Sequence, residues 1–411
     1  MTQTHHRPFA KQPLLIERLL VFVMAVAVFT WKPGMYIVPG ALFLYFVVRV
    51  IRDAQYRADW LQSRISIFSL LLFVLGLICV WISVGNVKEV LWVARKGLCL
   101  LMVPPLVLAF RHQANRISAF WGLMIGLWAN VVVVVVQSLA LPLGQVLAGR
   151  IEGIWYLGPW DALLGLFIAF LLPKLTESTP QIPRMLVHIT FAAAIVLLLL
   201  SGGRAPWVAT ALIMGAYLVL FHRKVLVYLT LTIVVVGLAA VQFFPTQVQP
   251  KLERITSIVN TEDSGNWVRL HLWSLGVDHL KFYAQHEPLK LIAGAGPSTY
   301  HAEQKSFFTQ QDYPADVRAR LILYGYPTGD THNMYLDAAL RMGVVWTALF
   351  LVFMFALAYV PSGPSVRQRI APLLLLGSYL IVGMFYTTVL SFVTFFIVFF
   401  LTLSVAQAKK T

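Results

Sequence analysis

The chain has 411 residues, of which 59% are hydrophobic and 12% are charged, and its mean hydropathy is +0.76. Soluble domains carry about 25% charged residues and need polar atoms over their surface, so this composition excludes a soluble globular enzyme. In a soluble protein the formal charge of +15 would indicate a nucleic-acid partner. In a membrane protein we attribute it to loops that set the topology and to an anionic ligand. Cys79 and Cys99 both lie in apolar runs, which argues against a disulfide framework and a thiolate metal site.

Apolar runs recur along the whole chain, and a membrane-spanning helix uses about 20 apolar residues. The runs cover roughly residues 14–31, 34–48, 65–84, 88–110, 117–141, 157–172, 185–200, 205–221, 225–244, 332–360, 370–386 and 389–406. They predict an all-α polytopic membrane protein with about twelve transmembrane helices. The weakest candidates are 34–48, which is short and contains Pro39, and 157–172, which contains Asp161.

The distribution of basic residues predicts the orientation, because lysine and arginine are enriched in cytoplasmic loops. With both termini in the cytoplasm, the inner segments hold Arg7, Lys11, Arg49, Arg52, Arg57, Arg64, Arg111, Arg116, Lys174, Arg184, Arg223, Lys224, Arg367, Arg369, Lys409 and Lys410. The short outer loops hold only Lys32, Lys88, Arg150 and Arg204. We therefore expect three parts: helices 1–9 of the bundle over residues 1–244, a large outer loop over 245–331, and helices 10–12 over 332–411. Within the loop, apolar residues at helical spacing over 266–284 predict an amphipathic helix.

Arg204 belongs to the turn Ser201-Gly202-Gly203-Arg204-Ala205-Pro206 between two predicted spans. Glycines end helices and proline suits a first helical turn, so Arg204 is expected at a helix N-terminus. The helix dipole disfavours a cation there, whereas such termini bind phosphate well. An anion beside Arg204 would resolve this conflict. The alternative is an arginine that extends to the membrane interface.

Arg269 and His332 are two further polar residues that the topology does not require. Arg269 lies on the predicted amphipathic helix, where it is either a ligand or part of a solvated face. In Gly329-Asp330-Thr331-His332-Asn333, Asp330 or Thr331 is expected to cap a helix and to place His332 in its first turn. The helix dipole and nearby arginines favour a neutral imidazole, the form that a general base needs. The alternative is an inert interfacial histidine.

Lys88, Arg95 and Lys96 lie within the apolar run 88–110. Cations inside a span indicate a polar cavity or an anionic headgroup, unless the span begins only after Lys96. Arg150, in the following outer loop, is a further candidate anion ligand. The sequence has no Gly-rich nucleotide loop and no clustered Cys/His site, so we expect neither a cofactor nor a metal.

Four motifs together carry a family resemblance: Ser201-Gly-Gly-Arg204, Arg269 with Trp273, Gly294-Ala-Gly296, and Thr331-His332-Asn333-Met-Tyr335-Leu336 followed by Gly343. In these the chain resembles the lipopolysaccharide O-antigen ligase family, part of a larger group with O-antigen polymerases and protein O-oligosaccharyltransferases. The resemblance is specific mainly between about Ser201 and Gly343. Elsewhere it rests on the general plan of a GT-C-like membrane bundle.

The resemblance implies a metal-independent, inverting glycosyltransferase of the bacterial inner membrane with a periplasmic active site. Its donor is a glycan on undecaprenyl pyrophosphate and its acceptor a sugar hydroxyl of lipid A–core. His332 would be the general base, and Arg204 and Arg269 would stabilise the leaving pyrophosphate. On charge reasoning alone, Lys88, Arg95, Lys96 and Arg150 would contribute to donor binding.

Three alternative functions remain open at this stage. An O-antigen polymerase or a protein O-oligosaccharyltransferase would use the same lipid-linked donor with another acceptor. A lipid-glycan transporter would belong to a different class of protein. Transporters usually show repeated halves and helices interrupted at the midplane, and neither is evident in this sequence.

Overall fold

The computed structural model describes residues 15–139, 151–176, 181–310, 312–323, 330–359 and 366–405, and these contain helices and no strands. The helices before the large polar interval are α1 (Leu15–Thr30), α2 (Gly34–Arg52), α3 (Ala54–Leu61), α4 (Arg64–Val84), α5 (Val87–Lys96), α6 (Leu98–Leu101), α7 (Val103–Ala109), α8 (Gln113–Leu139), α10 (Leu157–Leu171) with the 3-10 turn Leu172–Leu175, α11 (Arg184–Ser201), α12 (Arg204–Phe221) and α13 (Arg223–Phe243). The remaining helices are α14 (Pro245–Thr256), α15 (Ser264–His286), α16 (Pro288–Ala293), α17 (Pro297–Gln310), α18 (Ala315–Leu323), α19 (Met334–Met342), α20 (Val344–Tyr359), α21 (Val366–Gly383) and α22 (Phe392–Val405).

The long apolar helices confirm the prediction of an all-α polytopic membrane protein. Seven helices of the described chain are long and apolar enough to cross a membrane, and an eighth is formed if a bent pair counts as one span. Three apolar helices near the C-terminus are shorter. At 1.5 Å per residue, the 14 residues of α22 extend only about 21 Å. The expected number of twelve spans stays a prediction.

The run expected as a single span over 88–110 is bent by 45° between Val87–Lys96 and Leu98–Ala109. The break falls at Gly97, whose Cα packs against the ring of Phe73. Lys88, Arg95 and Lys96 therefore lie on the short helix α5 before the bend and not within a straight span. This corrects the expectation of cations inside a continuous transmembrane helix.

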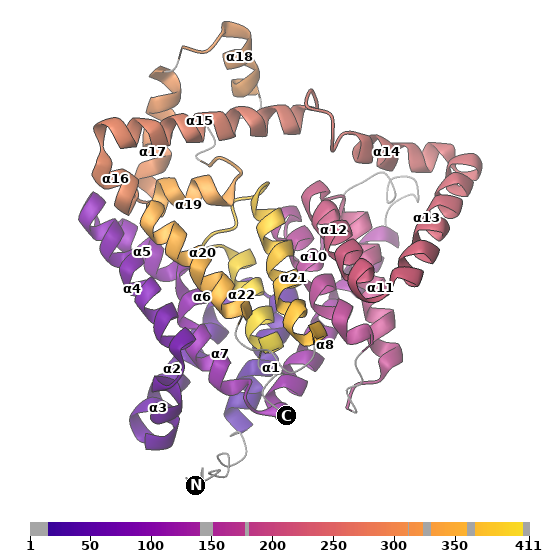
Figure 1. The fold of residues 1–411 in the computed structure, drawn as a ribbon, viewed down its shortest axis with the longest axis horizontal. Helices are drawn as coiled ribbons and strands as arrows, with labels where there is room; N and C mark the ends of the chain where they lie inside the picture. Colours follow the sequence, from indigo (N-terminus) through magenta and orange to yellow (C-terminus); the bar gives the residue numbers. More distant parts are fainter. Residues whose placement is uncertain are drawn as a thin grey trace.

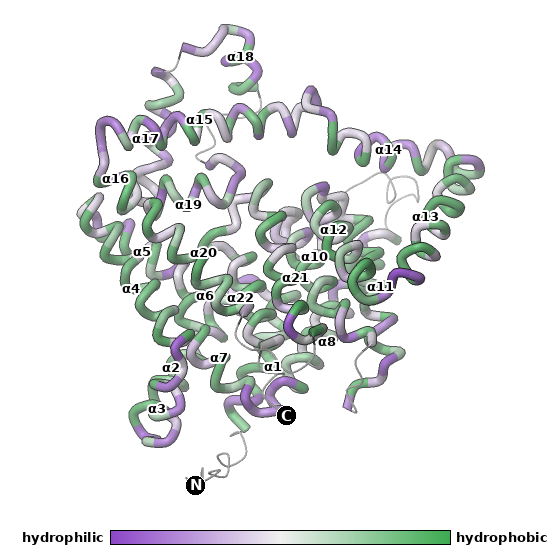
Figure 2. The backbone as a smooth tube through the Cα atoms, viewed as in Figure 1, coloured by the Kyte–Doolittle hydropathy of each residue, from purple (hydrophilic) through white to green (hydrophobic). Residues whose placement is uncertain are grey.

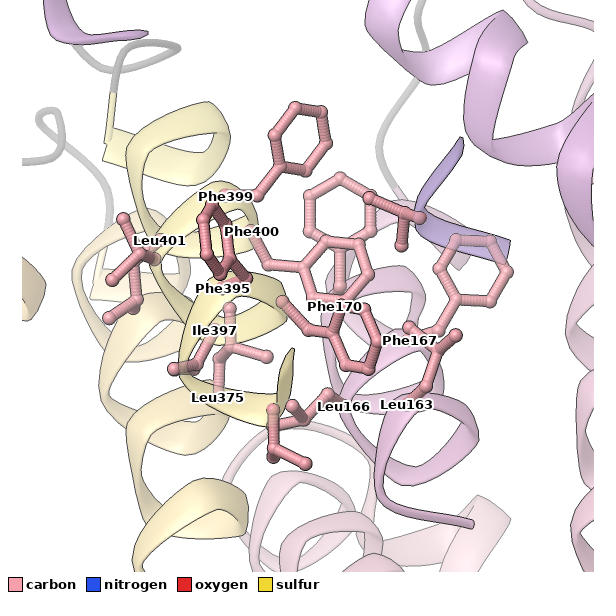
Figure 3. Packing of buried hydrophobic residues seen from close by; sticks show 14 of the residues in the cluster. Leu163, Leu166, Phe167, Phe170, Leu375, Phe395, Ile397, Phe399, Phe400 and Leu401 are labelled. Carbon is pink, nitrogen blue, oxygen red and sulfur yellow. The ribbon is translucent and has the colours of Figure 1, made fainter. Parts of the chain in front are cut away.

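The centre of the bundle is a dry aromatic and aliphatic core around α10 and α22 (Figure 3). Phe400 of α22 packs against Phe170 and Phe167 of α10, with ring centroids 5.2 Å and 6.0 Å apart. A helix that is apolar on all sides is either buried in a core or exposed to lipid, and α10 is of the first kind. Helix α13 is of the second kind, because none of its residues is buried and its main contacts among the described helices are with its chain neighbours α12 and α14.

Helices α14 to α18 form a layer across one end of the bundle, and α3 lies at the opposite end (Figure 1). The layer is of mixed hydropathy, whereas the bundle beneath it is mostly hydrophobic (Figure 2). At the α3 end, Arg111 of the α7–α8 turn forms an ion pair with Asp59 of α3, with 3.6 Å between Nη1 and Oδ2. Basic residues expected in cytoplasmic loops thus meet at the end farthest from the polar layer.

Two glycine bends join the layer to the bundle. Gly294 and Gly343 have φ of +83° and +86°, a region that favours glycine. A Cβ on Gly294 would collide with the backbone of Arg341, and a Cβ on Gly343 with the backbone of Ile292. Backbone hydrogen bonds from Ala295 and Gly296 to the end of α19 close this contact. The two glycine motifs of the sequence are therefore parts of one packing contact.

Candidate functional site

The Arg204 turn adopts the conformation that its residues predict. Helix α11 ends at Gly202, which has φ of +74°, and α12 begins at Arg204 after Gly203. Gly203 is required by close packing, because a Cβ there would collide with the fully buried carboxylate of Asp161. Arg204 therefore stands at a helix N-terminus at the end of the bundle that the α14–α18 layer covers.

The anion beside Arg204 is supplied by the chain itself. Nη1 of Arg204 donates to Oδ1 of Asp263 at 2.7 Å and to the hydroxyl of Ser257 at 2.9 Å. Asp263 also caps α15 by accepting from the N–H groups of Gly265 and Asn266. Partial burial tends to raise the pKa of Asp263, but the hydrogen bond and charge of Arg204 outweigh it and hold the pKa below its usual value. The carboxylate is therefore ionised at neutral pH.

Three arginines converge on one small cavity beneath the α14–α15 junction. The cavity has a volume of about 140 Å³ and is lined by Arg204, Ala205, Val208, Arg254, Ile258, Asn266, Arg269, Phe385 and Tyr386. Gly265 allows the guanidinium groups to approach each other, because a Cβ there would lie 2.6 Å from Nη2 of Arg204 and 3.7 Å from Nη1 of Arg269. We call this set of residues the arginine pocket. Such a cluster of forked donors suits phosphate oxygens.

Arg254 is the member of the arginine pocket that the sequence reasoning did not identify. It lies on α14, and its Nε donates to the carbonyl of Gly202 at 2.5 Å. The available signal was its position on a short basic stretch, Lys251 to Arg254, in the outer loop. That stretch resembles any solvated helix face, and only the packing of α14 against the Arg204 turn distinguishes it.

His332 lies in a different place from the one predicted. Asn333 caps α19, since its side chain accepts from the N–H groups of Tyr335 and Leu336. His332 therefore precedes the helix and is not in its first turn, and it adopts φ of +50°, which is unusual for a residue with a side chain. Its imidazole is 42% exposed, and Nδ1 lies 3.3 Å from Oδ1 of Asp330.

The chain segment after α21 connects the His332 loop with the arginine pocket. Phe385 and Tyr386 line the pocket, and the side chain of Asn333 donates to the carbonyl of Met384, the residue before them. The ring of Phe385 also packs against Trp273 of α15, with 5.9 Å between centroids. His332 itself is not among the residues that line the pocket. The structure thus places a cluster of cations and an exposed histidine on neighbouring parts of one surface.

The predicted ligands on α5 do not line the arginine pocket. Lys88 and Arg95 are exposed on α5. Lys96 donates to the hydroxyl of Tyr36 at 3.3 Å and lies 5.5 Å from the ring centroid of Phe392. Arg150 lies outside the described residues. The five predicted donor ligands that the structure describes are therefore divided between two in the pocket, Arg204 and Arg269, and three separate cations on α5.

Glu89 makes a structural contact that the sequence reasoning missed. Its buried carboxylate accepts from the N–H groups of Ser298 and Thr299, at 2.9 Å and 2.8 Å, and thereby caps α17. These hydrogen bonds join the α14–α18 layer to α5. Among the described residues no group of three or more His, Cys, Asp and Glu side chains is arranged to hold a metal ion.

Residues 189–351 match the family model described as O-antigen ligase. These residues form an O-antigen ligase domain. The domain extends from α11 into α20 and contains Arg204, Arg254, Arg269 and His332, whereas α5 precedes it. No curated protein matches the chain. The O-antigen ligase domain supports a function of the O-antigen ligase or polymerase type in a membrane protein.

Proposed function

We propose that the protein ligates O-antigen polysaccharide from undecaprenyl pyrophosphate onto a sugar hydroxyl of lipid A–core. The observation that carries this proposal is the arginine pocket, in which Arg204, Arg254 and Arg269 converge beside the exposed His332 loop. A lipid-linked diphosphate donor needs cationic donors at the end of a membrane bundle. It also needs a nearby base for an acceptor that arrives from water.

The reaction follows from these groups. The acceptor hydroxyl attacks the anomeric carbon of the donor sugar as His332 takes the hydroxyl proton, and the bond from that carbon to the pyrophosphate oxygen breaks. Undecaprenyl pyrophosphate leaves with the electron pair, and because the hydroxyl attacks the opposite face of the sugar, the anomeric configuration inverts. Negative charge grows on the leaving oxygen, where the guanidinium groups of Arg204, Arg254 and Arg269 stabilise it without a metal ion.

Two features tune the arginine pocket for such a ligand. Asp263 already neutralises part of the charge of Arg204, so a diphosphate shares or displaces that carboxylate on binding. Phe385 and Tyr386 give the cavity an aromatic wall, which lowers the local dielectric and strengthens each charge-assisted hydrogen bond. The Lys88, Arg95 and Lys96 cations of α5 would attract the donor from a greater distance.

The decisive test is transfer from an undecaprenyl-pyrophosphate glycan to purified rough lipopolysaccharide, with and without chelator. We expect transfer in both conditions. His332→Ala should abolish nearly all transfer, with only a slow residual rate, and leave donor binding nearly intact, because the base acts on the acceptor. Arg204→Ala or Arg269→Ala should weaken donor binding and slow turnover by about 100-fold or more, by analogy with the loss of an oxyanion donor.

Matched controls come from the ends of α11 and α12 that lie away from the Arg204 turn. His188→Ala on α11 and Arg223→Ala after α12 remove exposed side chains of the same types and should retain wild-type transfer.

Near wild-type transfer by His332→Ala would contradict the assignment of the base. Labelling of a second lipid-linked glycan in place of lipopolysaccharide would indicate a polymerase. Movement of the glycan across liposomes without transfer would indicate a transporter.

A further inference from the structure

Asp330 makes two contacts with His332 through one oxygen. Its Oδ1 accepts the backbone N–H of His332 at 3.1 Å and lies 3.3 Å from Nδ1 of the imidazole. The carboxylate is 29% exposed and the imidazole 42% exposed. The side chain of Asp330 thus holds the backbone of His332 by a hydrogen bond and lies beside Nδ1 of its ring.

The loop that carries this pair is held from two sides. The buried carboxylate of Asp337 accepts from the backbone N–H of Thr331 at 2.9 Å and from the hydroxyl of Thr387. The methyl group of Thr331 packs against Gly276 of α15, where a Cβ would lie only 2.8 Å away. These contacts maintain the positive φ of His332, a conformation that persists only where its surroundings enforce it.

A carboxylate beside Nδ1 determines which nitrogen of a histidine is basic. The proton of the neutral ring resides on Nδ1, where it can be donated to the carboxylate, and the lone pair is then on Nε2. The negative charge also stabilises the imidazolium that forms when Nε2 takes a proton. Both effects favour proton transfer from an acceptor hydroxyl to Nε2.

We propose that Asp330 is the positioning residue of His332, holding the imidazole in the tautomer and orientation in which Nε2 accepts the proton of the acceptor hydroxyl. The inference rests on the proposed function, because it concerns the base of that reaction. Asp330 acts through His332 and touches neither substrate. Asp337 has the separate role of fixing the loop backbone.

The test compares Asp330→Asn with Asp337→Asn in the transfer assay. Asparagine at 330 keeps the oxygen that accepts the backbone N–H, so the loop retains its shape. It removes the negative charge that holds Nδ1–H toward residue 330 and stabilises the imidazolium formed when Nε2 takes a proton. We expect kcat to fall by about 100-fold or more while the donor KM stays within about twofold and the melting temperature is unchanged. Asp337→Asn should instead lower the melting temperature, because it weakens the contacts with Thr331 and Thr387.

A double mutant separates positioning from a general structural effect. If Asp330 acts only through His332, then Asp330→Asn should cause no further loss of the residual rate in a His332→Ala background. A kcat near that of the wild type in Asp330→Asn, or an equal loss in both backgrounds, would overturn the inference and leave the proposed function standing. Near wild-type transfer by His332→Ala would overturn both. The two failures are therefore distinguishable.

Discussion

At the residue scale, the charge of Arg204 explains how the candidate site is built. A cation at a helix N-terminus is unfavourable by about 0.3–1 kcal/mol in exposed settings, and the sequence therefore predicts an anion beside it. In the structure that anion is Asp263, 59 residues farther along the chain. The same carboxylate caps α15. One ion pair thus joins the starts of two helices and sets the position of Arg204 in the arginine pocket.

Gly265 provides a prediction at this scale. Alanine is favoured over glycine in a helix by about 1 kcal/mol, so Gly265→Ala should not destabilise α15. Its methyl group would lie 2.6 Å from Nη2 of Arg204 and would displace the guanidinium. Because a shift of about 1 Å can cost on the order of 100-fold in rate, we expect transfer to fall by about 10-fold to 100-fold with no loss of melting temperature.

The control for this substitution is Gly237→Ala on α13, where no atom lies within 4 Å of the added Cβ. This variant should transfer glycan at the wild-type rate. Steady-state kinetics and thermal unfolding of the two variants in the same detergent make the comparison. Wild-type transfer by Gly265→Ala would show that the position of Arg204 is not critical.

At the element scale, α15 combines two roles along its 23 residues. Its first two turns carry Asn266 and Arg269 of the arginine pocket, and its second half packs against α16, α17 and α19. His279 lies in that second half and is 2% exposed. Its ring stacks on Phe307 of α17, with 4.3 Å between centroids. The histidine is thus part of the core that holds the layer together.

Burial lowers the pKa of His279 from 6.5 to about 4. Two nearby charges have smaller effects, because Glu287 raises this pKa and Lys290 lowers it. The folded layer therefore binds fewer protons than the unfolded chain between these values. Its stability is fully present above pH 6.5 and declines as the pH falls toward 4. By linkage the loss from about pH 7.5 to about pH 5 is about 2 kcal/mol.

Thermal unfolding of the purified protein across this pH range measures the effect. We expect the melting temperature of the wild type to decrease toward low pH, and the decrease to be smaller in His279→Gln, which has no titrating group at this position. An identical pH dependence in the two proteins would show that protonation of another group controls the stability of the layer.

At the scale of the whole molecule, the two ends of the bundle differ in chemistry. One end carries α3 and the Arg111–Asp59 ion pair, and the other carries the α14–α18 layer (Figure 1). The positive-inside rule predicts that the α3 end faces the cytoplasm. The arginine pocket would then face the periplasm, as the proposed donor and acceptor require.

Cysteine labelling of intact cells tests this orientation. In a background with Cys79 and Cys99 replaced by alanine, Val259→Cys between α14 and α15 and Leu61→Cys at the end of α3 introduce thiols at sites that are 84% and 54% exposed. A maleimide that crosses the outer but not the inner membrane should label Val259→Cys at once. Leu61→Cys should react only after permeabilisation. The reverse pattern would place the pocket in the cytoplasm.

Local signals in the sequence predicted the class of the protein and much of the site. Hydropathy predicted the helices, and the Gly202-Gly203 turn marked where α12 begins. The start of the His332 helix was placed two or three positions too early, because Asn333 competes with Asp330 and Thr331 as the cap and only the packed structure resolves that competition. The bend at Gly97 was missed for a similar reason, since hydropathy averages over a window and does not register a change of direction.

By itself the sequence determined an all-α membrane bundle, the start of α12 and three of the residues proposed for the chemistry, because these depend on neighbours a few positions apart. Only the tertiary structure decided that Arg254 joins Arg204 and Arg269, that Asp263 is the anion of Arg204, and that Thr387 holds the His332 loop through Asp337. These partners are separated by 50 or more residues along the chain. Their meeting depends on how α14 and α15 pack over the bundle, and a pattern of nearby residues does not encode that packing.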